Sequence, residues 1–178
     1  LRLSESEIAR LGMGRKFQRP TVFENQTVQD NLVVSLNGNR DPMSTLFYRA
    51  GTTDLSKVEE LAMEIGLEQS LDRVAGELSH GQKQWLAISM LVAQSPDIIL
   101  LDEPVAGLTD EETNRTAELI KSLAGEHTVV VIEHDMEFIR DLGAPVTVLH
   151  QGQLLTEGSL EEVKSDPKVI EVYLGQTE

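Results

Sequence analysis

Ile98-Ile99-Leu100-Leu101-Asp102-Glu103-Pro104 is an apolar run that ends in two carboxylates and a proline. A short continuous apolar run with turn residues on both sides predicts a strand buried on both faces, as in a parallel sheet. Open α/β sheets bind their ligands beyond the carboxyl ends of the strands. Asp102 and Glu103 are therefore candidates for metal binding and proton transfer. Taken alone, the pair fits a charged turn after a strand equally well.

The sequence that follows this run alternates between helical and strand patterns. Thr109 to Glu112 forms a capping box, which predicts a helix as far as Ala124. Further segments are predicted as strands at 128–132 and 146–149, a helix at 135–142, a hairpin pairing 146–150 with 153–157, and a helical tail at 160–174. This alternation predicts an α/β fold around a parallel sheet.

The sequence before residue 98 is predicted to be mainly helical. Ser4 and Glu7 form a second capping box, and Asp54 is expected to cap a helix that ends at Gly66. The other predictions are a short strand at 14–17, a helix at 27–36, a mobile connection at 37–53, and a helix from about 82 to 93 after a turn at 79–81.

Composition excludes several classes of protein. The 178 residues carry 30 acidic and 15 basic side chains, a net charge of −15, which argues against a sequence-independent nucleic-acid surface. There is no cysteine, so disulfides, thiolate metal sites and cysteine nucleophiles are excluded. No apolar run approaches the roughly 20 residues of a membrane-spanning helix, and no secretory signal opens the sequence.

A second chemical feature lies about two dozen residues before the carboxylates. In Leu78-Ser79-His80-Gly81-Gln82, a hydroxyl and a glycine stand at the predicted start of a helix. Unsatisfied backbone N–H groups at such a position favour anions. The alternative is a simple helix cap by Ser79 with a turn glycine at Gly81. The carboxylates at this distance favour the anion site.

These stretches resemble the motifs of ABC ATPases. Residues 78–82 resemble the signature motif, 98–104 the Walker B strand, and Phe17-Gln18 the Q-loop. Residues 106–109 resemble the D-loop, and Ile132-Glu133-His134 the switch-histidine loop. The five motifs follow the family's order across essentially the whole chain. The resemblance implies an α/β ABC-type P-loop NTPase domain with a RecA-like parallel sheet and a helical subdomain. We expect a single incomplete domain over 1–178, with the helical subdomain at about 20–93 and the core at about 94–178.

The resemblance implies a role for each matching residue. Gln18 would contact Mg²⁺ and the attacking water, Asp102 would serve the metal, and Glu103 would be the general base. His134 would hold the γ-phosphate and orient Glu103. The motif residues facing the γ-phosphate of ATP on the opposite subunit would be Ser79, His80, Gly81 and Gln82.

Two residues depart from the commonest form of the motifs and indicate a branch of the family. His80 stands where glycine is usual, and Thr109 where the D-loop usually has Asp. Residues 78–86, 103–113 and 170–175 resemble ATP-binding subunits of urea importers, which are relatives of the branched-chain amino acid importers. The sequence therefore predicts an ATPase powering import of a small polar solute, with urea as the leading substrate. The alternatives are a branched-chain amino acid importer and a non-transport ATPase of DNA repair.

The partners and location follow from the same resemblance. It implies a head-to-tail dimer with a second ATPase subunit and contact with membrane permease subunits through the Q-loop region. A periplasmic solute-binding protein would act indirectly, and no nucleic acid is expected. The protein would be peripheral on the cytoplasmic face of the membrane.

The phosphate-gripping loop of the family is missing from the sequence. No glycine is followed by lysine, so Gly-x-x-x-x-Gly-Lys-Ser/Thr is absent. The family's sheet order would place the corresponding strand beside the strand that ends before His134. We therefore expect exposed strand edges that lead either to association with another copy or to a rearranged sheet, and we expect this chain to have negligible ATPase activity.

Overall fold

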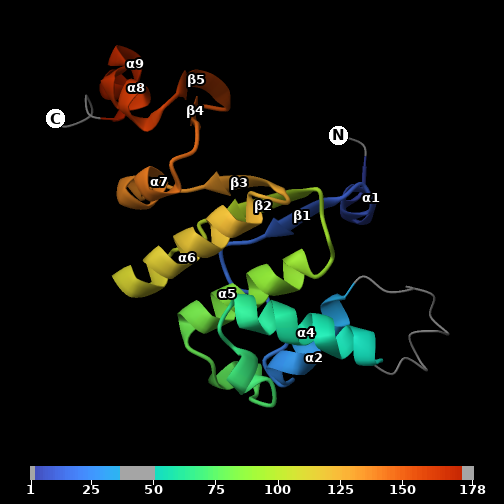
Figure 1. Ribbon diagram of the computed structural model, residues 1–178. Helices are drawn as coiled ribbons and strands as arrows, with labels where there is room; N and C mark the ends of the chain where they lie inside the picture. Colours follow the sequence, from blue (N-terminus) through green and yellow to red (C-terminus); the bar gives the residue numbers. More distant parts are fainter. Residues whose placement is uncertain (1–2, 37–50, 174–178) are drawn as a thin grey trace. The chain divides into compact units, whose positions relative to one another are not determined.

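The computed structural model describes residues 3–36 and 51–173 (Figure 1). Most of the connection predicted at 37–53 therefore lies outside the described residues. The chain divides into two compact units, Leu1–Glu133 and His134–Glu178. The predicted helical subdomain at about 20–93 falls within the first unit, and its separation from the core stays a prediction.

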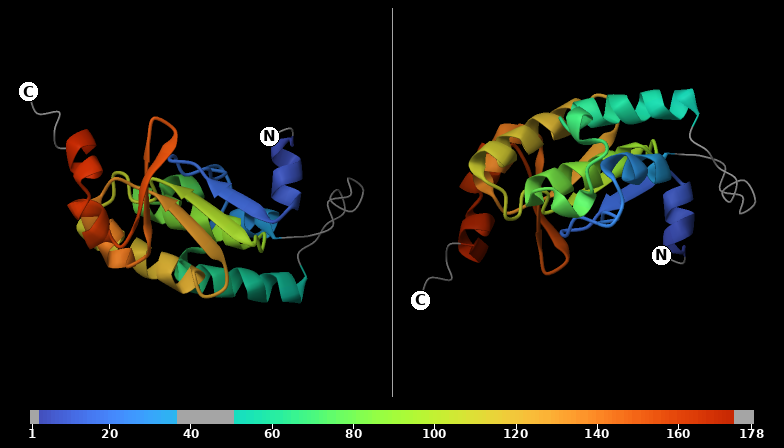
Figure 2. Two further views of the ribbon diagram at one scale, coloured as in Figure 1. Left: turned by 90° about the horizontal axis from the view of Figure 1, so that it is seen from above. Right: turned by 90° about the horizontal axis from the view of Figure 1, so that it is seen from below.

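The first unit contains a three-stranded parallel sheet. Its strands are β1 (Met13–Lys16), β2 (Ile98–Asp102) and β3 (Thr128–Ile132), in the order β1-β2-β3. They lie side by side in both views of Figure 2. The register pairs Lys16 with Leu101 and Asp102 with Ile132. The predicted parallel sheet is thus confirmed, and the carboxylates follow its central strand.

Five helices and two short 3₁₀ turns complete the described part of this unit. The helices are α1 (Glu5–Arg10), α2 (Val28–Ser35), α4 (Thr52–Glu64), α5 (His80–Val92) and α6 (Asp110–Leu123), and the turns are η1 (Glu68–Ser70) and η2 (Ala75–Glu77). Side-chain caps begin most of them: Ser4, Thr27, Ser79 and Thr109 each accept a hydrogen bond from the backbone of the third helical residue. These are the serines and threonines that local sequence chemistry selects.

Two predicted helix starts are wrong. Gly51, rather than Asp54, is the N-cap of α4, and Thr52 and Thr53 belong to the helix. Asp54 is the third helical residue, where its carboxylate accepts the N–H of Gly51 at 2.9 Å. Helix α5 begins at His80 rather than near Gln82, because Gln82 is the third residue and closes a capping box with Ser79. In both cases the third residue of the helix accepts the N–H of the N-cap residue through its side chain.

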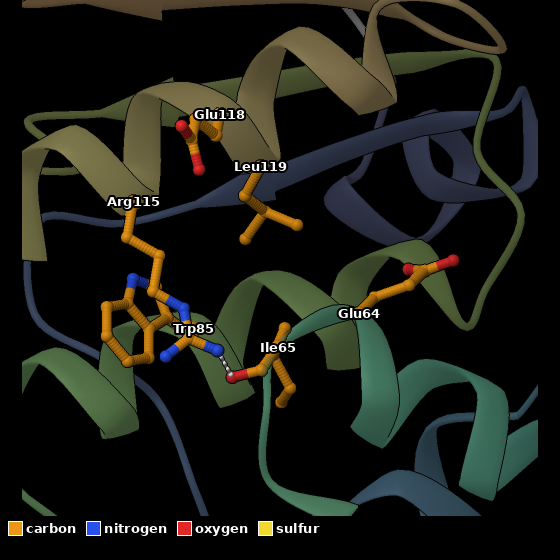
Figure 3. Close-up of a pocket in the computed structure, with 6 residues that line it drawn as sticks. All are labelled: Glu64, Ile65, Trp85, Arg115, Glu118 and Leu119. Atoms are coloured by element: carbon orange, nitrogen blue, oxygen red, sulfur yellow. Dashed lines mark hydrogen bonds between the residues drawn. The ribbon is translucent and has the colours of Figure 1, made fainter.

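Helix α5 is the buried centre of the first unit, and Trp85 ties it to α6. The indole Nε1 donates to Thr116 Oγ1 at 2.9 Å, and the guanidinium of Arg115 lies 4.3 Å from the indole ring. Arg115 also donates to the backbone oxygen of Ile65 at 2.7 Å, at the end of α4 (Figure 3). A pocket between α4, α5 and α6 is lined by Glu64, Ile65, Trp85, Arg115, Glu118 and Leu119. Gly66 follows with φ +62°, and a side chain there would meet the Arg115 guanidinium.

The second unit holds an antiparallel hairpin and three helices within the described residues. Helix α7 (Met136–Leu142) starts at its cap Asp135 and ends at Gly143, whose φ is +65°. Strands β4 (Val146–His150) and β5 (Gln153–Gly158) pair as predicted, and both turn residues Gln151 and Gly152 have positive φ. The helical tail is two helices, α8 (Leu160–Ser165) and α9 (Pro167–Tyr173), because Pro167 cannot continue the first.

The sheet of the first unit has an open edge at β3. Among residues 3–36 and 51–173, no strand pairs with the side of β3 opposite β2. Val130 and Ile132 on this strand are 44% and 57% exposed. The predicted exposed strand edge is therefore observed, whereas association with another copy stays a prediction. In the part of the chain that the structure describes, no helix is long and apolar enough to cross a membrane.

Candidate functional site

Gln18 and Glu103 meet at the carboxyl edge of the sheet. Gln18 lies two residues beyond β1, and Glu103 directly follows β2, its parallel neighbour. The Gln18 side-chain amide donates a hydrogen bond to the Glu103 carboxylate. Two residues that are 85 positions apart in sequence are thus brought together, as parallel strands with matched register allow.

The backbone of Glu103 adopts a conformation that is uncommon for a residue with a side chain. Its φ is +44°, in the left-handed region. The strain is held in place by the chain around it, since the N–H of Glu103 donates to Ile132 O at 2.9 Å. Non-glycine residues in this region cluster at functional sites, where the surrounding structure fixes a side-chain direction. The backbone therefore aims the Glu103 carboxylate.

Asp102 is half-buried and engaged by a cation. Arg15 Nη2 lies 3.0 Å from Asp102 Oδ2, and the same guanidinium is 4.6 Å from the Phe17 ring. The described residues contain no group of three His, Cys, Asp or Glu side chains able to hold a metal ion. A magnesium ion here would draw on the oxygens of Asp102 and Gln18, the hard ligands it prefers, and on water. Such an ion would compete with Arg15 for the carboxylate.

Lys16 is a buried cation that the sequence did not single out. Only 5% of the residue is exposed, and its Nζ donates to the Phe17 backbone oxygen at 3.0 Å. Burial lowers the pKa of Lys16 to about 8, while the nearby carboxylates of Asp102 and Glu133 raise it. The sequence signal that could have identified Lys16 was its place at the end of a predicted strand, next to a strand that ends in two carboxylates. Lys16 offsets part of the negative charge of this edge.

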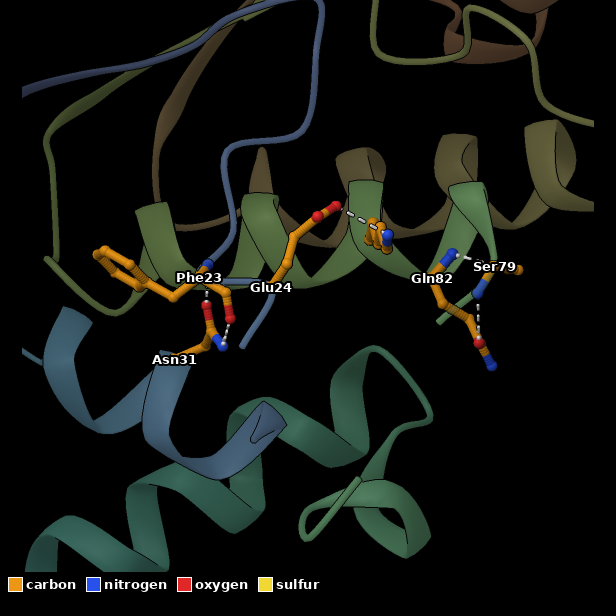
Figure 4. Close-up of polar contacts among 6 residues, drawn as sticks. Phe23, Glu24, Asn31, Ser79 and Gln82 are labelled. Carbon is orange, nitrogen blue, oxygen red and sulfur yellow. Dashed lines mark hydrogen bonds and ion pairs between the residues drawn. The ribbon is translucent and has the colours of Figure 1, made fainter. Parts of the chain in front are cut away.

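The signature-like residues form the first turn of α5. Ser79 caps Gln82 N at 3.1 Å, and Gln82 Oε1 accepts Ser79 N at 3.0 Å (Figure 4). The first turn of a helix leaves N–H groups without intrahelical acceptors, which makes this end suitable for an anion. An ion pair also joins α5 to the segment before α2, because Lys83 Nζ lies 2.9 Å from Glu24 Oε1.

Glu112 of α6 stands against this helix end. The Ser79 hydroxyl donates to Glu112 Oε1 at 3.4 Å, and a side chain at Gly81 would collide with the same carboxylate. A side chain at position 81 would therefore have to push the Glu112 carboxylate aside. A phosphate at Ser79 would meet the Glu112 charge, so binding would need the carboxylate to turn away.

A buried amide helps to hold the segment that joins Phe17 to α2. Asn31 is fully buried, accepts the N–H of Phe23 at 2.7 Å and donates to the backbone oxygens of Phe23 and Thr27 (Figure 4). The sequence analysis did not identify Asn31, and its place within a predicted helix gave no signal for this role. The side chain sets the path of the chain that follows Gln18.

His134 opens the second unit. It precedes Asp135, whose side chain accepts the N–H groups of Glu137 and Phe138 and so starts α7. The predicted action of His134 on the γ-phosphate and on Glu103 would join the two units, and it stays a prediction.

Comparison with known proteins bears on this arrangement. A family model described as ABC transporter matches residues 2–106, and one described as branched-chain amino acid ATP-binding cassette transporter matches residues 153–178. The high-affinity branched-chain amino acid transport ATP-binding protein LivG of Salmonella typhimurium is 34% identical, over 98% of this chain and 72% of its own length. BraF of Pseudomonas aeruginosa, described in the same words, is 35% identical over 96% and 70%.

A solved structure shows the same fold. The nucleotide-free ATP-binding cassette of an ABC transporter superposes with a TM-score of 0.79 at 29% identity, over 98% of this chain and 73% of that one. The fold and its parallel sheet are thus those of an ATP-binding cassette. The family match and the curated relatives agree with the fold, and the chain belongs to the ABC transporter family of ATP-binding proteins.

Proposed function

We propose that the protein is the ATP-hydrolysing subunit of an ABC importer, with Glu103 as the general base. The observation that carries this proposal is the hydrogen bond from Gln18 to Glu103 at the end of the central strand. Glu103 accepts a proton from water, and Gln18 holds the carboxylate where the Q-loop segment enters the site. A residue that orients the attacking water or accepts its proton is a recurring part of sites that transfer a phosphoryl group to water.

ATP and Mg²⁺ fit the remaining residues. Asp102 lies beside Glu103 and supplies a carboxylate for the metal, which would neutralise phosphate charge when bound. Ser79, His80, Gly81 and Gln82 surround the open end of α5, which would face the γ-phosphate of a nucleotide held by a second subunit. His134 would complete the site.

Branched-chain amino acids are a better supported solute class than urea. LivG and BraF are both branched-chain amino acid transport proteins, and the C-terminal family match carries the same description. The urea prediction rested on short stretches of resemblance and gains no support from these relatives. The DNA-repair alternative is likewise unsupported, since the relatives are transport proteins.

The proposed partners are a second ATPase subunit and the permease subunits of a membrane transporter, with a solute-binding protein acting through the permease. The working protein would lie on the cytoplasmic face of the membrane.

The test is ATP turnover by a form of the protein that includes the family's Gly-x-x-x-x-Gly-Lys-Ser/Thr loop. Glu103→Gln keeps the shape of the side chain but removes the base, so we expect turnover to fall by about 10²- to 10⁴-fold. Glu111→Gln is the matched control, since Glu111 is an exposed carboxylate in the first turn of α6. Equal turnover in both variants would contradict the assignment of Glu103.

A further inference from the structure

The turn at 103–107 is the element that carries Glu103 from β2 toward α6. It contains its own hydrogen bond, from the N–H of Ala106 to the backbone oxygen of Glu103 at 3.3 Å. Outside support comes from Glu133, whose Oε1 accepts the N–H of Val105 at 3.2 Å. The strained φ of Glu103 depends on this support, because an isolated turn would relax toward negative φ.

Helix α5 holds the same turn from its other side, at two points one helical turn apart. His80 Nε2 lies 3.2 Å from the backbone oxygen of Ala106. Gln84 Nε2 donates to the backbone oxygen of Pro104 at 3.3 Å, and Gln84 is fully buried. Residues four apart lie on one face of a helix, so both side chains reach the turn together.

In the first turn of α5, His80 makes the contact with Ala106. Its neighbour Gly81 has no side chain, and the side chain of Gln82 accepts the N–H of Ser79. A carbonyl oxygen only accepts hydrogen bonds, so Nε2 of His80 must carry the proton, as it does in the imidazolium and in one neutral tautomer.

We propose that His80 is a positioning residue that couples the phosphate-facing end of α5 to the backbone of Glu103. The link consists of two hydrogen bonds through Ala106: its oxygen accepts from His80, and its N–H donates to Glu103. A group bound at Ser79 would displace the first turn of α5 and so act on the turn that holds Glu103. The functional meaning of this role rests on the proposed function. The hydrogen-bonded link itself is present without nucleotide.

The test is amide hydrogen exchange of the 178-residue chain, followed residue by residue by NMR without nucleotide. Loss of a neutral hydrogen bond in His80→Ala should speed exchange at Ala106 by about two- to tenfold. His80→Gln, which keeps a donor on a side chain of similar reach, should restore most of the protection. The amides of β2 should keep their wild-type rates in both variants.

The matched control is His127→Ala. His127 makes the same type of contact, from Nδ1 to the Pro96 backbone oxygen at 2.6 Å, but near the start of β2. His127→Ala should leave the exchange rate of the Ala106 amide unchanged. Unchanged exchange at Ala106 in His80→Ala would overturn the proposal, as would acceleration by one common factor at Ala106, α5 and β2. Neither result would alter the ATPase proposal, which turnover tests separately.

Discussion

Strands β2 and β3 are parallel neighbours of equal length that lie in different surroundings. In β2, Ile99 and Leu101 are completely buried between two partner strands and the helices. In β3, Val130 and Ile132 are exposed, and the described residues pair with only one of its edges. Both runs are equally apolar in sequence. The strand that carries the two carboxylates is therefore packed on both sides. In the described residues, the neighbouring strand β3 is paired along one edge and has exposed apolar side chains.

The largest expected effect is a contrast in stability between these strands. Leu101→Ala removes a side chain with no exposed surface, which should lower the free energy of unfolding by about 2–5 kcal/mol. Val130→Ala removes a side chain that is 44% exposed and should cost clearly less. Urea denaturation of both variants measures the contrast, and equal losses would show that β3 is as firmly packed as β2.

The open edge of β3 should also drive self-association. Unpaired backbone groups and exposed apolar side chains favour pairing with a second copy. We expect dimers or larger species in light scattering, and Ile132→Lys should shift the population toward monomer by placing a charge at that edge. A monomer at all accessible concentrations of the unmodified chain would contradict this prediction.

Local chemistry explains which features the sequence could predict. The caps at Ser4, Thr27 and Thr109 depend on residues three positions apart, so pattern alone finds them. The starts of α4 and α5 were missed because Asp54 and Gln82 satisfy the same boxes from inside the helix. Short-range pattern therefore predicted the elements better than their first residues.

The sequence supplied candidate site residues but not their contacts, and the roles of these residues stay predictions. Asp102 and Glu103 follow from a predicted strand end and from the family resemblance, and Gln18 follows from the resemblance alone. The engagement of Asp102 by Arg15 and of Ser79 by Glu112 joins residues 87 and 33 positions apart. Such contacts depend on side-chain directions that the sequence pattern does not specify.

A smaller effect concerns Glu64, the last residue of α4. Burial raises the pKa of Glu64, with Glu126 and Glu60 adding to the rise and His127 opposing it. Because the pKa of Glu64 in the folded protein lies above its ordinary value of 4.5, stability should fall as pH rises from that value through the folded pKa. Glu64→Gln should flatten this dependence in thermal unfolding scans, by a modest amount because the side chain is only partly buried and its charge is screened by water. If the pH dependence of unfolding were the same in Glu64→Gln, the titration of Glu64 would not contribute to it.

The most direct test of this account of the site is ATP turnover by the 178-residue chain itself. The chain holds Glu103, Asp102 and Gln18 in place but has no loop to grip the β-phosphate. We predict no turnover above the uncatalysed background at any ATP concentration. Measurable turnover that disappears in Glu103→Gln would contradict this account, because it would show that the carboxylate site works without that loop.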